Sequence, residues 1–210
     1  IHIGASYLGN DIEAWRLFIK LYTMYENVLF RFAYGDKINA RKYILRFAEP
    51  ISDYLYSNLF VLDKINYEEY LKNVLCTNSK DKAVNFKNIL FLDIENNKEK
   101  NTVEFRIPNA SIEEVIWQNN INTFTKMFIA SKKKMIDEDL LNYKLKNEYV
   151  SYKNNEHLYS EINLKKALEF IDFIFDDNVD KIYFLRQYLK NFENYYGLCG
   201  AVKAKRFIKI

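Results

Sequence analysis

The segment Thr102–Pro108, which reads TVEFRIP, decides the fold class of this chain. Its apolar residues alternate with its polar residues, and this period of two indicates a β-strand with one buried face. Pro108 has no backbone N–H group and ends the strand. The segment therefore predicts a strand over 102–107 that buries its apolar side chains and presents Glu104 and Arg106 on the opposite face.

Two further segments show the same alternation. Ile1–Ala5 carries His2 on its polar side, and Lys82–Asn88 carries Asn85 on its polar side. We predict that both segments join the strand 102–107 in one sheet, the second as a long-looped antiparallel hairpin partner, and that their polar side chains share a face. That face would gather an imidazole, a carboxamide, a carboxylate and a guanidinium group. The alternative is the mixed polar face that any half-solvated sheet carries.

The rest of the chain has the pattern of helices. Asn10 with Glu13, and Ser111 with Glu114, have the spacing of capping boxes, which predicts that helices begin at Asn10 and Ser111. Helices are expected over about residues 10–34, 41–47, 51–60, 111–131, 137–149, 164–175 and 181–195, and another beginning at 66.

We therefore predict an α+β fold, in which helices pack on a small, mainly antiparallel sheet and a helical region follows at the C-terminal end. The scarcity of Gly (5) and Pro (2) agrees with this class. A soft boundary near 131–136 would divide a core over 1–131 from a helical extension over 132–210 packed on it. In the extension, an apolar packing face could contact a partner subunit of a homo-oligomer; it comprises Phe170, Phe173, Ile174 and Phe175.

Charge and composition argue against several classes of function. The 31 basic and 28 acidic residues leave a net charge of +3, which is too weak to indicate a nucleic-acid partner. No apolar run approaches the roughly 20 residues of a membrane span. Cys76 and Cys199 form no CxxC pair, which favours a reduced, cytoplasmic protein. We also expect sequence upstream of Ile1, because the chain begins inside a strand.

Glu104 and Arg106 are of the types that phosphoryl transfer uses. A carboxylate can hold a divalent metal ion, and a guanidinium group stabilises charge on the transferred phosphoryl oxygens. Two residues apart on a strand, the side chains would point the same way, roughly 6–7 Å apart. The alternative is an Arg–Glu ion pair on the open face of the sheet.

Three segments resemble strands of the amidoligases of bacteria and phages, which are carboxylate–amine ligases of the glutamine-synthetase-like superfamily. Ile1–Leu8 (IHIGASYL) resembles the second half of their H-I/V-H-I/V-G strand, Lys82–Phe86 (KAVNF) their short ALNL-type strand, and Thr102–Asn109 (TVEFRIPN) their T-I/V-E-F-R strand. In the following loop Ala110 replaces the family's glycine, and Trp117–Asn119 on the next helix is in register. The resemblance covers about residues 1–131.

The resemblance implies a glutamine-synthetase-like catalytic core that uses ATP and Mg²⁺ to activate a carboxylate as an acyl phosphate, which an amine then attacks to form an amide. The substrates would be an amino acid, a peptide or a polyamine. Glu104 matches the family's metal-binding glutamate, and Arg106 matches the arginine that contacts the transferred phosphate. His2 matches a histidine near the nucleotide phosphates, and Asn85 matches an asparagine that lines the substrate or nucleotide site.

The chain also departs from the family pattern. The first histidine of the H-x-H pair is not in this sequence, nor is the N-terminal strand pair that supplies further metal carboxylates, so we expect these 210 residues to be inactive on their own. Arg41 and Arg46 lie where the family carries arginines; they would bind a phosphate or a carboxylate, or else lie on a solvated helix face. The alternatives to a ligase are a non-catalytic binding or assembly protein that retains the core and, against the mild net charge, a nucleic-acid binder.

Overall fold

The computed structural model of the protein describes residues 1–34, 47–59, 81–89, 101–108, 113–151 and 161–189. These residues form an α+β fold, as predicted. The strands are β1 (His2–Gly4), β2 (Val84–Asn88) and β3 (Thr102–Phe105). The helices are α1 (Ile12–Tyr34), α3 (Ser52–Leu59), α5 (Glu114–Lys132), α6 (Glu138–Glu148), α7 (Glu161–Ile174) and α8 (Asn178–Tyr188), with a 3-10 turn, η1 (Ala5–Tyr7), after β1.

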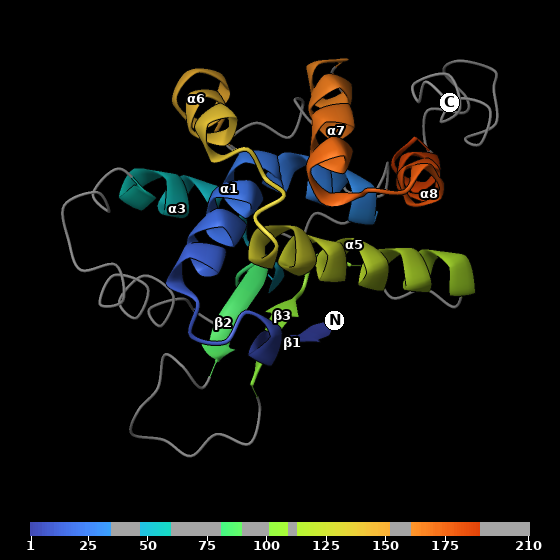
Figure 1. Ribbon diagram of the computed structural model, residues 1–210. Coiled ribbons are helices and arrows are strands. Elements are labelled where there is room, and N and C mark those ends of the chain that lie inside the picture. Colours follow the sequence, from blue (N-terminus) through green and yellow to red (C-terminus); the bar gives the residue numbers. More distant parts are fainter. Residues whose placement is uncertain (35–46, 60–80, 90–100, 109–112, 152–160, 190–210) are drawn as a thin grey trace.

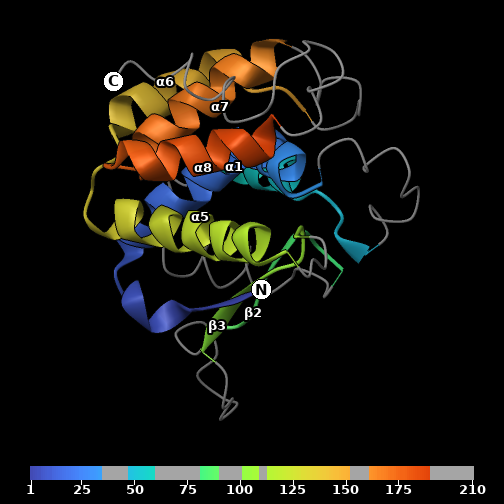
Figure 2. The same cartoon turned by 90° about the vertical axis from the view of Figure 1, so that its right-hand side faces the viewer.

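The elements are arranged in layers around α1. The sheet lies against α1 and α5, and α6, α7 and α8 lie on the side of these two helices that is remote from the sheet (Figures 1 and 2). Helix α1 contacts α3, α5, α6, α7 and α8, and every residue from 17 to 33 is buried. A helix that is covered on all sides is the centre of a fold rather than a surface element.

Aromatic side chains join the sheet to the helices. Phe18 of α1 contacts Phe86 of β2 and Phe105 of β3, with ring centroids 6.3 and 6.2 Å apart. Phe105 also stacks on Phe124 of α5 at 4.1 Å. Ring pairs at these separations add to the stabilisation from apolar burial. One face of the sheet is thus fixed as the core face, and the polar residues of the strands must lie on the other.

Helix α3 is held at its first turn by a carboxylate from α1. The Glu26 side chain is buried and accepts hydrogen bonds from the backbone N–H groups of Ile51 (2.9 Å) and Ser52 (2.8 Å). Burial raises the pKa of Glu26, and these hydrogen bonds act in the opposite direction. Acceptance of otherwise unpaired N–H groups at a helix start is the role of an N-cap, supplied here from another helix.

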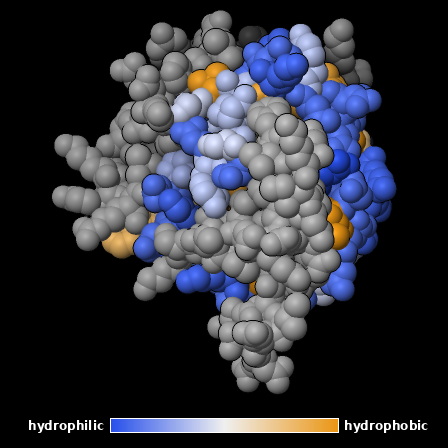
Figure 3. Space-filling model, turned by 90° about the vertical axis from the view of Figure 1, so that its left-hand side faces the viewer, coloured by the Kyte–Doolittle hydropathy of each residue, from blue (hydrophilic) through white to orange (hydrophobic). Residues whose placement is uncertain are grey.

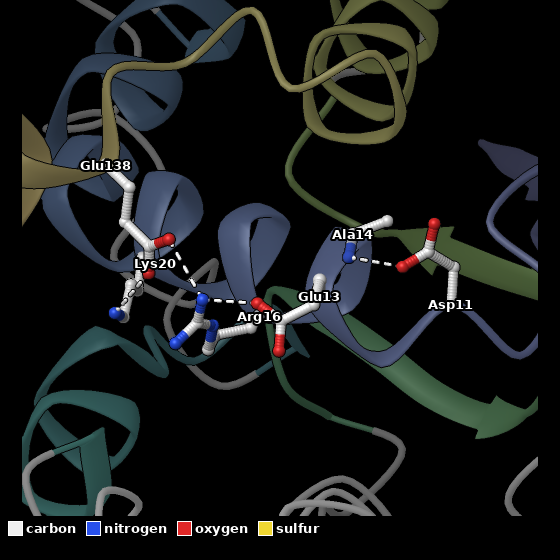
Figure 4. Close-up of polar contacts among 6 residues, drawn as sticks. All are labelled: Asp11, Glu13, Ala14, Arg16, Lys20 and Glu138. Carbon is white, nitrogen blue, oxygen red and sulfur yellow. Dashed lines mark hydrogen bonds and ion pairs between the residues drawn. The ribbon is translucent and has the colours of Figure 1, made fainter.

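A second polar contact joins α6 to α1 (Figure 4). Glu138, in the first turn of α6, accepts from Arg16 Nη2 and from Lys20 Nζ, both at 2.9 Å. Arg16 also pairs with Glu13 on its own helix. These bonds between the two helices account for the position of α6. Because every charged side chain in the group has a partner, the group needs no ligand.

The predicted cap of α1 is wrong, and α5 begins later than predicted. Asp11, rather than Asn10, caps α1 by accepting from the backbone N–H of Ala14 at 3.1 Å (Figure 4). Helix α5 begins at Glu114, after an N-cap residue, Glu113, with extended backbone (φ −74°, ψ 112°) and no side-chain capping bond. A helix beginning at Ser111 would require helical backbone at 113. Ser111 itself lies outside the described residues.

The helical extension belongs to the same core as the sheet. Phe170 and Phe173 contact Tyr25 of α1 at 5.4 and 6.0 Å, and Phe175 contacts Phe184 of α8 at 6.1 Å. Buried side chains from both sides of the expected 131–136 boundary form one cluster. The apolar face expected to meet a partner subunit is therefore buried within its own chain.

On the side of α3, few apolar side chains of the described residues are exposed to solvent. There the coloured surface is largely hydrophilic, and its apolar residues form small, separated spots (Figure 3). Among the described residues, no helix combines the length and apolar character needed to cross a membrane.

Candidate functional site

The three strands bring the predicted polar residues together on one face of the sheet. The strand order is β1-β3-β2, and both pairings are antiparallel. In this register Glu104, on the central strand, lies directly opposite His2 of β1 and Asn85 of β2. Because side chains alternate along a strand, Glu104 points away from the buried Phe105. The prediction of a single sheet with a shared polar face is confirmed.

Three side chains converge on the Glu104 carboxylate. Asn85 Nδ2 donates to Oε2 at 3.1 Å, while Arg106 Nη1 lies 3.8 Å and His2 Nε2 4.0 Å from Oε1. The side chains of Glu104 and Arg106 are 23% and 26% exposed, and that of His2 is 49% exposed. Partly solvated ion pairs of this kind contribute about 0–1 kcal/mol to stability. The cluster is thus accessible, and the fold depends little on its charges.

Asn85 holds Glu104 in place. Asn85 is only 5% exposed, and its Oδ1 accepts from the backbone N–H of Lys87 at 2.9 Å. This bond lies at the irregularity in the β2–β3 register between 85 and 88. Because Oδ1 is used by a backbone donor, the NH₂ group must face Glu104, and the assignment of the amide follows. The geometry gives Asn85 a positioning role, and its predicted contact with a substrate or nucleotide stays a prediction.

Thr102 lies on the polar face, as the alternation along 102–107 predicts, but it was not predicted to be a site residue. Its Oγ1 lies 3.2 Å from His2 Nδ1. A Thr102 hydroxyl that donates to Nδ1 leaves the proton of a neutral imidazole on Nε2, the nitrogen that faces Glu104. The signal was present in the sequence, since Thr102 precedes Glu104 by two residues and so shares its face.

The groups that face the Glu104 carboxylate are an amide, a guanidinium and an imidazole nitrogen. Among the residues that the structure describes, no group of three or more His, Cys, Asp and Glu side chains could hold a metal ion. Mg²⁺ commonly binds through one or two carboxylates, water and substrate phosphates. Glu104 could contribute one carboxylate to a metal ion whose other ligands come from phosphate and water. The described residues do not form a metal cage of their own.

A second ionisable cluster lies between α6 and α7. Lys144 Nζ lies 2.9 Å from Glu169 Oε2, and Lys166 Nζ donates to the backbone carbonyl of Glu148 at 2.9 Å. Burial lowers the pKa of Lys166. Both lysines are buried and have partners within the protein, so we assign the cluster to helix packing.

Two predicted site residues, Arg41 and Arg46, lie outside the described residues and stay predictions. The same holds for Cys76 and Cys199. No sequence-family model, no curated protein and no solved structure matches this chain. The geometry of the sheet face is therefore the basis on which a function can be proposed.

Proposed function

We propose that this protein is an ATP-dependent carboxylate–amine ligase and that the polar face of its sheet handles the phosphoryl group. The observation that carries the proposal is the convergence of Arg106 and His2 within 4.0 Å of the Glu104 carboxylate, on an accessible face opposite an aromatic core. A carboxylate beside a guanidinium and an imidazole group is a set that can bind a metal–phosphate ligand. The resemblance of the three strands to amidoligase strands supports the same assignment.

Each residue would have a distinct role in this reaction. Glu104 would hold Mg²⁺, which supplies charge neutralisation on the nucleotide phosphates when bound. The planar guanidinium group of Arg106 would contact two phosphoryl oxygens as phosphate passes from ATP to the substrate carboxylate. His2, the most exposed of the group, would donate to a nucleotide phosphate. The amine would then attack the acyl carbon, so that a C–N bond forms as the C–O bond to phosphate breaks, inorganic phosphate leaves, and the nitrogen gives up a proton to solvent.

A non-catalytic binding or assembly protein is the second candidate, and one observation favours it. Both oxygens of Glu104 already have neighbours, since Oε2 accepts from Asn85 and Oε1 faces Arg106 and His2. An ion cluster that is complete within the protein needs no metal or phosphate. The two candidates differ in what replacement of Arg106 would do.

The test is turnover of the complete protein, measured as ADP release with a panel of carboxylates and amines. Arg106→Lys keeps the charge and removes the planar fork, so we expect a loss of about 10²-fold in turnover with little change in melting temperature. Arg16→Lys is the matched control, because its side chain is also 26% exposed and pairs with a glutamate away from the sheet face. Equal turnover in wild type and Arg106→Lys would contradict the ligase and leave the non-catalytic candidate.

A further inference from the structure

The outer edge of β1 carries backbone groups that no other strand uses. Ile1 exchanges two hydrogen bonds with Phe105 of β3, at 2.8 and 2.7 Å. Along an antiparallel pair, the backbone groups of successive residues point to opposite edges of the strand. The N–H and C=O groups of His2 and the N–H group of Gly4 therefore point away from β3, and they have no backbone partner among the described residues. An edge with unpaired groups of this kind can accept a further strand.

Helix α5 extends past this edge. Phe124 of α5 stacks on Phe105 of β3 at 4.1 Å, so this side of the helix covers the sheet. Trp117 lies seven residues earlier, which is almost two turns, and so lies on the same side of α5. In Figure 1 the first turns of α5 continue beyond β1, on the side away from β3. Trp117 is thus on the side of the helix that would cover a fourth strand beside β1.

The apolar side chains beside this edge are only partly covered. Trp117 is 54% exposed, whereas Trp15 is 1% exposed. Ile1 and Ile3 of β1 pack against the core but are only partly buried. Large apolar side chains that lie together and exposed often mark an interaction site. A strand beside β1 would cover these side chains with its own apolar residues, which would occupy alternate positions along it.

The size of the edge indicates what kind of partner fits it. Strand β1 has three residues, and a stable dimer needs about 800 Å² of buried surface from each partner, far more than such a strand supplies. Antiparallel pairing of β1 with β1 of a second copy would also place both α5 helices on the same side of the joined sheet, each over the other's β1. A single extended segment brings no such helix, so it fits where a second copy does not.

We propose that the open edge of β1 binds an extended peptide segment of a partner protein, which adds a fourth strand to the sheet. The peptide backbone pairs with the outward groups of His2 and Gly4. Apolar side chains at alternate positions of the peptide lie against Ile1, Ile3 and Trp117, and the side chains between them lie on the polar face. The assignment does not rest on the ligase proposal, because it uses backbone groups and apolar side chains rather than the charges of that face.

The test is fluorescence titration of the 210-residue chain with the peptide acetyl-KTVTVTK-amide, without nucleotide or Mg²⁺. Valine and threonine favour extended backbone, and the peptide has no aromatic residue of its own. The chain has two tryptophans, and Trp15 is buried, so a change in emission on binding reports Trp117. We expect saturable binding with a shift of the emission to shorter wavelength as Trp117 loses contact with water.

Two methylated forms of the peptide test the backbone pairing. In an extended peptide the valine N–H groups point to one edge and the threonine N–H groups to the other. Methylation of the valine nitrogens or of the threonine nitrogens therefore removes the groups that face β1 in only one of the two forms. We expect one form to bind at least about tenfold more weakly than the parent peptide and the other to bind equally well. Both measurements use the wild-type chain and do not depend on the folding of a variant.

Gly4→Pro removes one outward donor from the edge of β1. The φ of Gly4 is −60°, which proline adopts, and a Cβ atom there would meet Ser6 Oγ at an ordinary contact distance of 3.8 Å. Gly4→Pro should weaken peptide binding about tenfold. Gly4→Ala is the matched control, because it adds a Cβ atom and keeps the N–H group, and it should leave binding unchanged.

Trp117→Ala should weaken binding about tenfold in calorimetry, and its control is Tyr143→Ala, since Tyr143 is 60% exposed on α6, remote from the sheet (Figure 1). The proposal is overturned if the peptide does not bind at millimolar concentration, if both or neither of the methylated forms lose affinity, or if each variant binds like its control. A dimer of the chain that the peptide does not dissociate would assign the edge to a second copy and would also overturn the proposal.

Discussion

Replacement of Asn85 by Asp would place a second carboxylate against Glu104. In the wild-type protein Asn85 Nδ2 donates to Glu104 Oε2 at 3.1 Å, and Asn85 is 5% exposed. The substitution changes one NH₂ group to an oxygen and leaves the other oxygen able to accept from Lys87. Its effect on stability therefore reports the contact between Asn85 and Glu104 and little else.

The loss of stability can be estimated from the distance between the two carboxylates. Two unit charges about 4 Å apart repel by about 4 kcal/mol at an effective dielectric constant of about 20. Arg106, 3.8 Å from Glu104, and partial solvation of Glu104 offset part of this repulsion. We expect Asn85→Asp to lower the free energy of unfolding by about 2 kcal/mol at pH 8, which corresponds to a fall of about 4–8 °C in Tm for a chain of this length.

The repulsion also determines how the stability of the Asn85→Asp variant changes with pH. Repulsion holds the pKa of the introduced carboxyl group above its unfolded value of about 3.9. The folded state then binds more protons than the unfolded state, so stability is lost as pH rises through the raised pKa. Below that pKa, the protonated group can donate to Glu104 and replace the lost hydrogen bond. Asn85→Asp should thus approach wild-type stability as the pH falls toward 4.

Urea unfolding followed by circular dichroism between pH 4 and 8 measures this effect. Asn88→Asp is the control, because it makes the same chemical change in the same strand, opposite Thr102 rather than Glu104. If the two variants lose stability equally and with the same dependence on pH, Asn85 does not contact Glu104 and the geometry of the face is wrong.

Two further predictions concern the scaffold. Phe105→Ala should lower the free energy of unfolding by about 3–5 kcal/mol in urea, because Phe105 is fully buried against Phe124; a cost below about 1 kcal/mol would show that β3 does not face the helices. Glu26→Gln should cost about 1–3 kcal/mol, because one end of its amide must face a backbone N–H group of Ile51 or Ser52. Exposed Glu13→Gln is its control, and equal melting temperatures for the two variants would contradict the buried cap.

The sheet could be predicted from the sequence because the alternation that indicates each strand lies within a few consecutive residues. The period of two around Glu104 determines which side chains share a face of the strand. Because Phe105 is buried on one face, Glu104 and its neighbours must lie on the other. The observed strands are shorter than the predicted segments, since strand ends depend on hydrogen-bond partners. The fold class followed from the same patterns together with the helical periodicity of α1 and the later helices.

The helix caps and the contact between Asn85 and Glu104 could not be predicted, because they depend on residues far apart in the sequence. Spacing suggested Asn10 and Ser111 as caps, but the cap of α1 is Asp11, because the choice is made by the path of the chain into the helix. The capping of α3 by Glu26 and the positioning of Glu104 by Asn85 join residues 25 and 19 positions apart. Such contacts carry no local signature.

Binding of Mg²⁺–ATP to the Glu104→Gln variant of the complete protein tests whether the polar face of the sheet holds a metal–nucleotide ligand. Gln has the size of Glu and can still accept from Asn85, but a neutral amide is a poor ligand for Mg²⁺. Glu49→Gln is the control, since Glu49 is an exposed carboxylate that pairs with Lys82 at the edge of the sheet. We expect calorimetry to detect ATP binding that requires Mg²⁺. Glu104→Gln should weaken this binding at least about tenfold and Glu49→Gln should leave it unchanged, with similar melting curves for both variants. Equal affinity in wild type and both variants would contradict the proposed site.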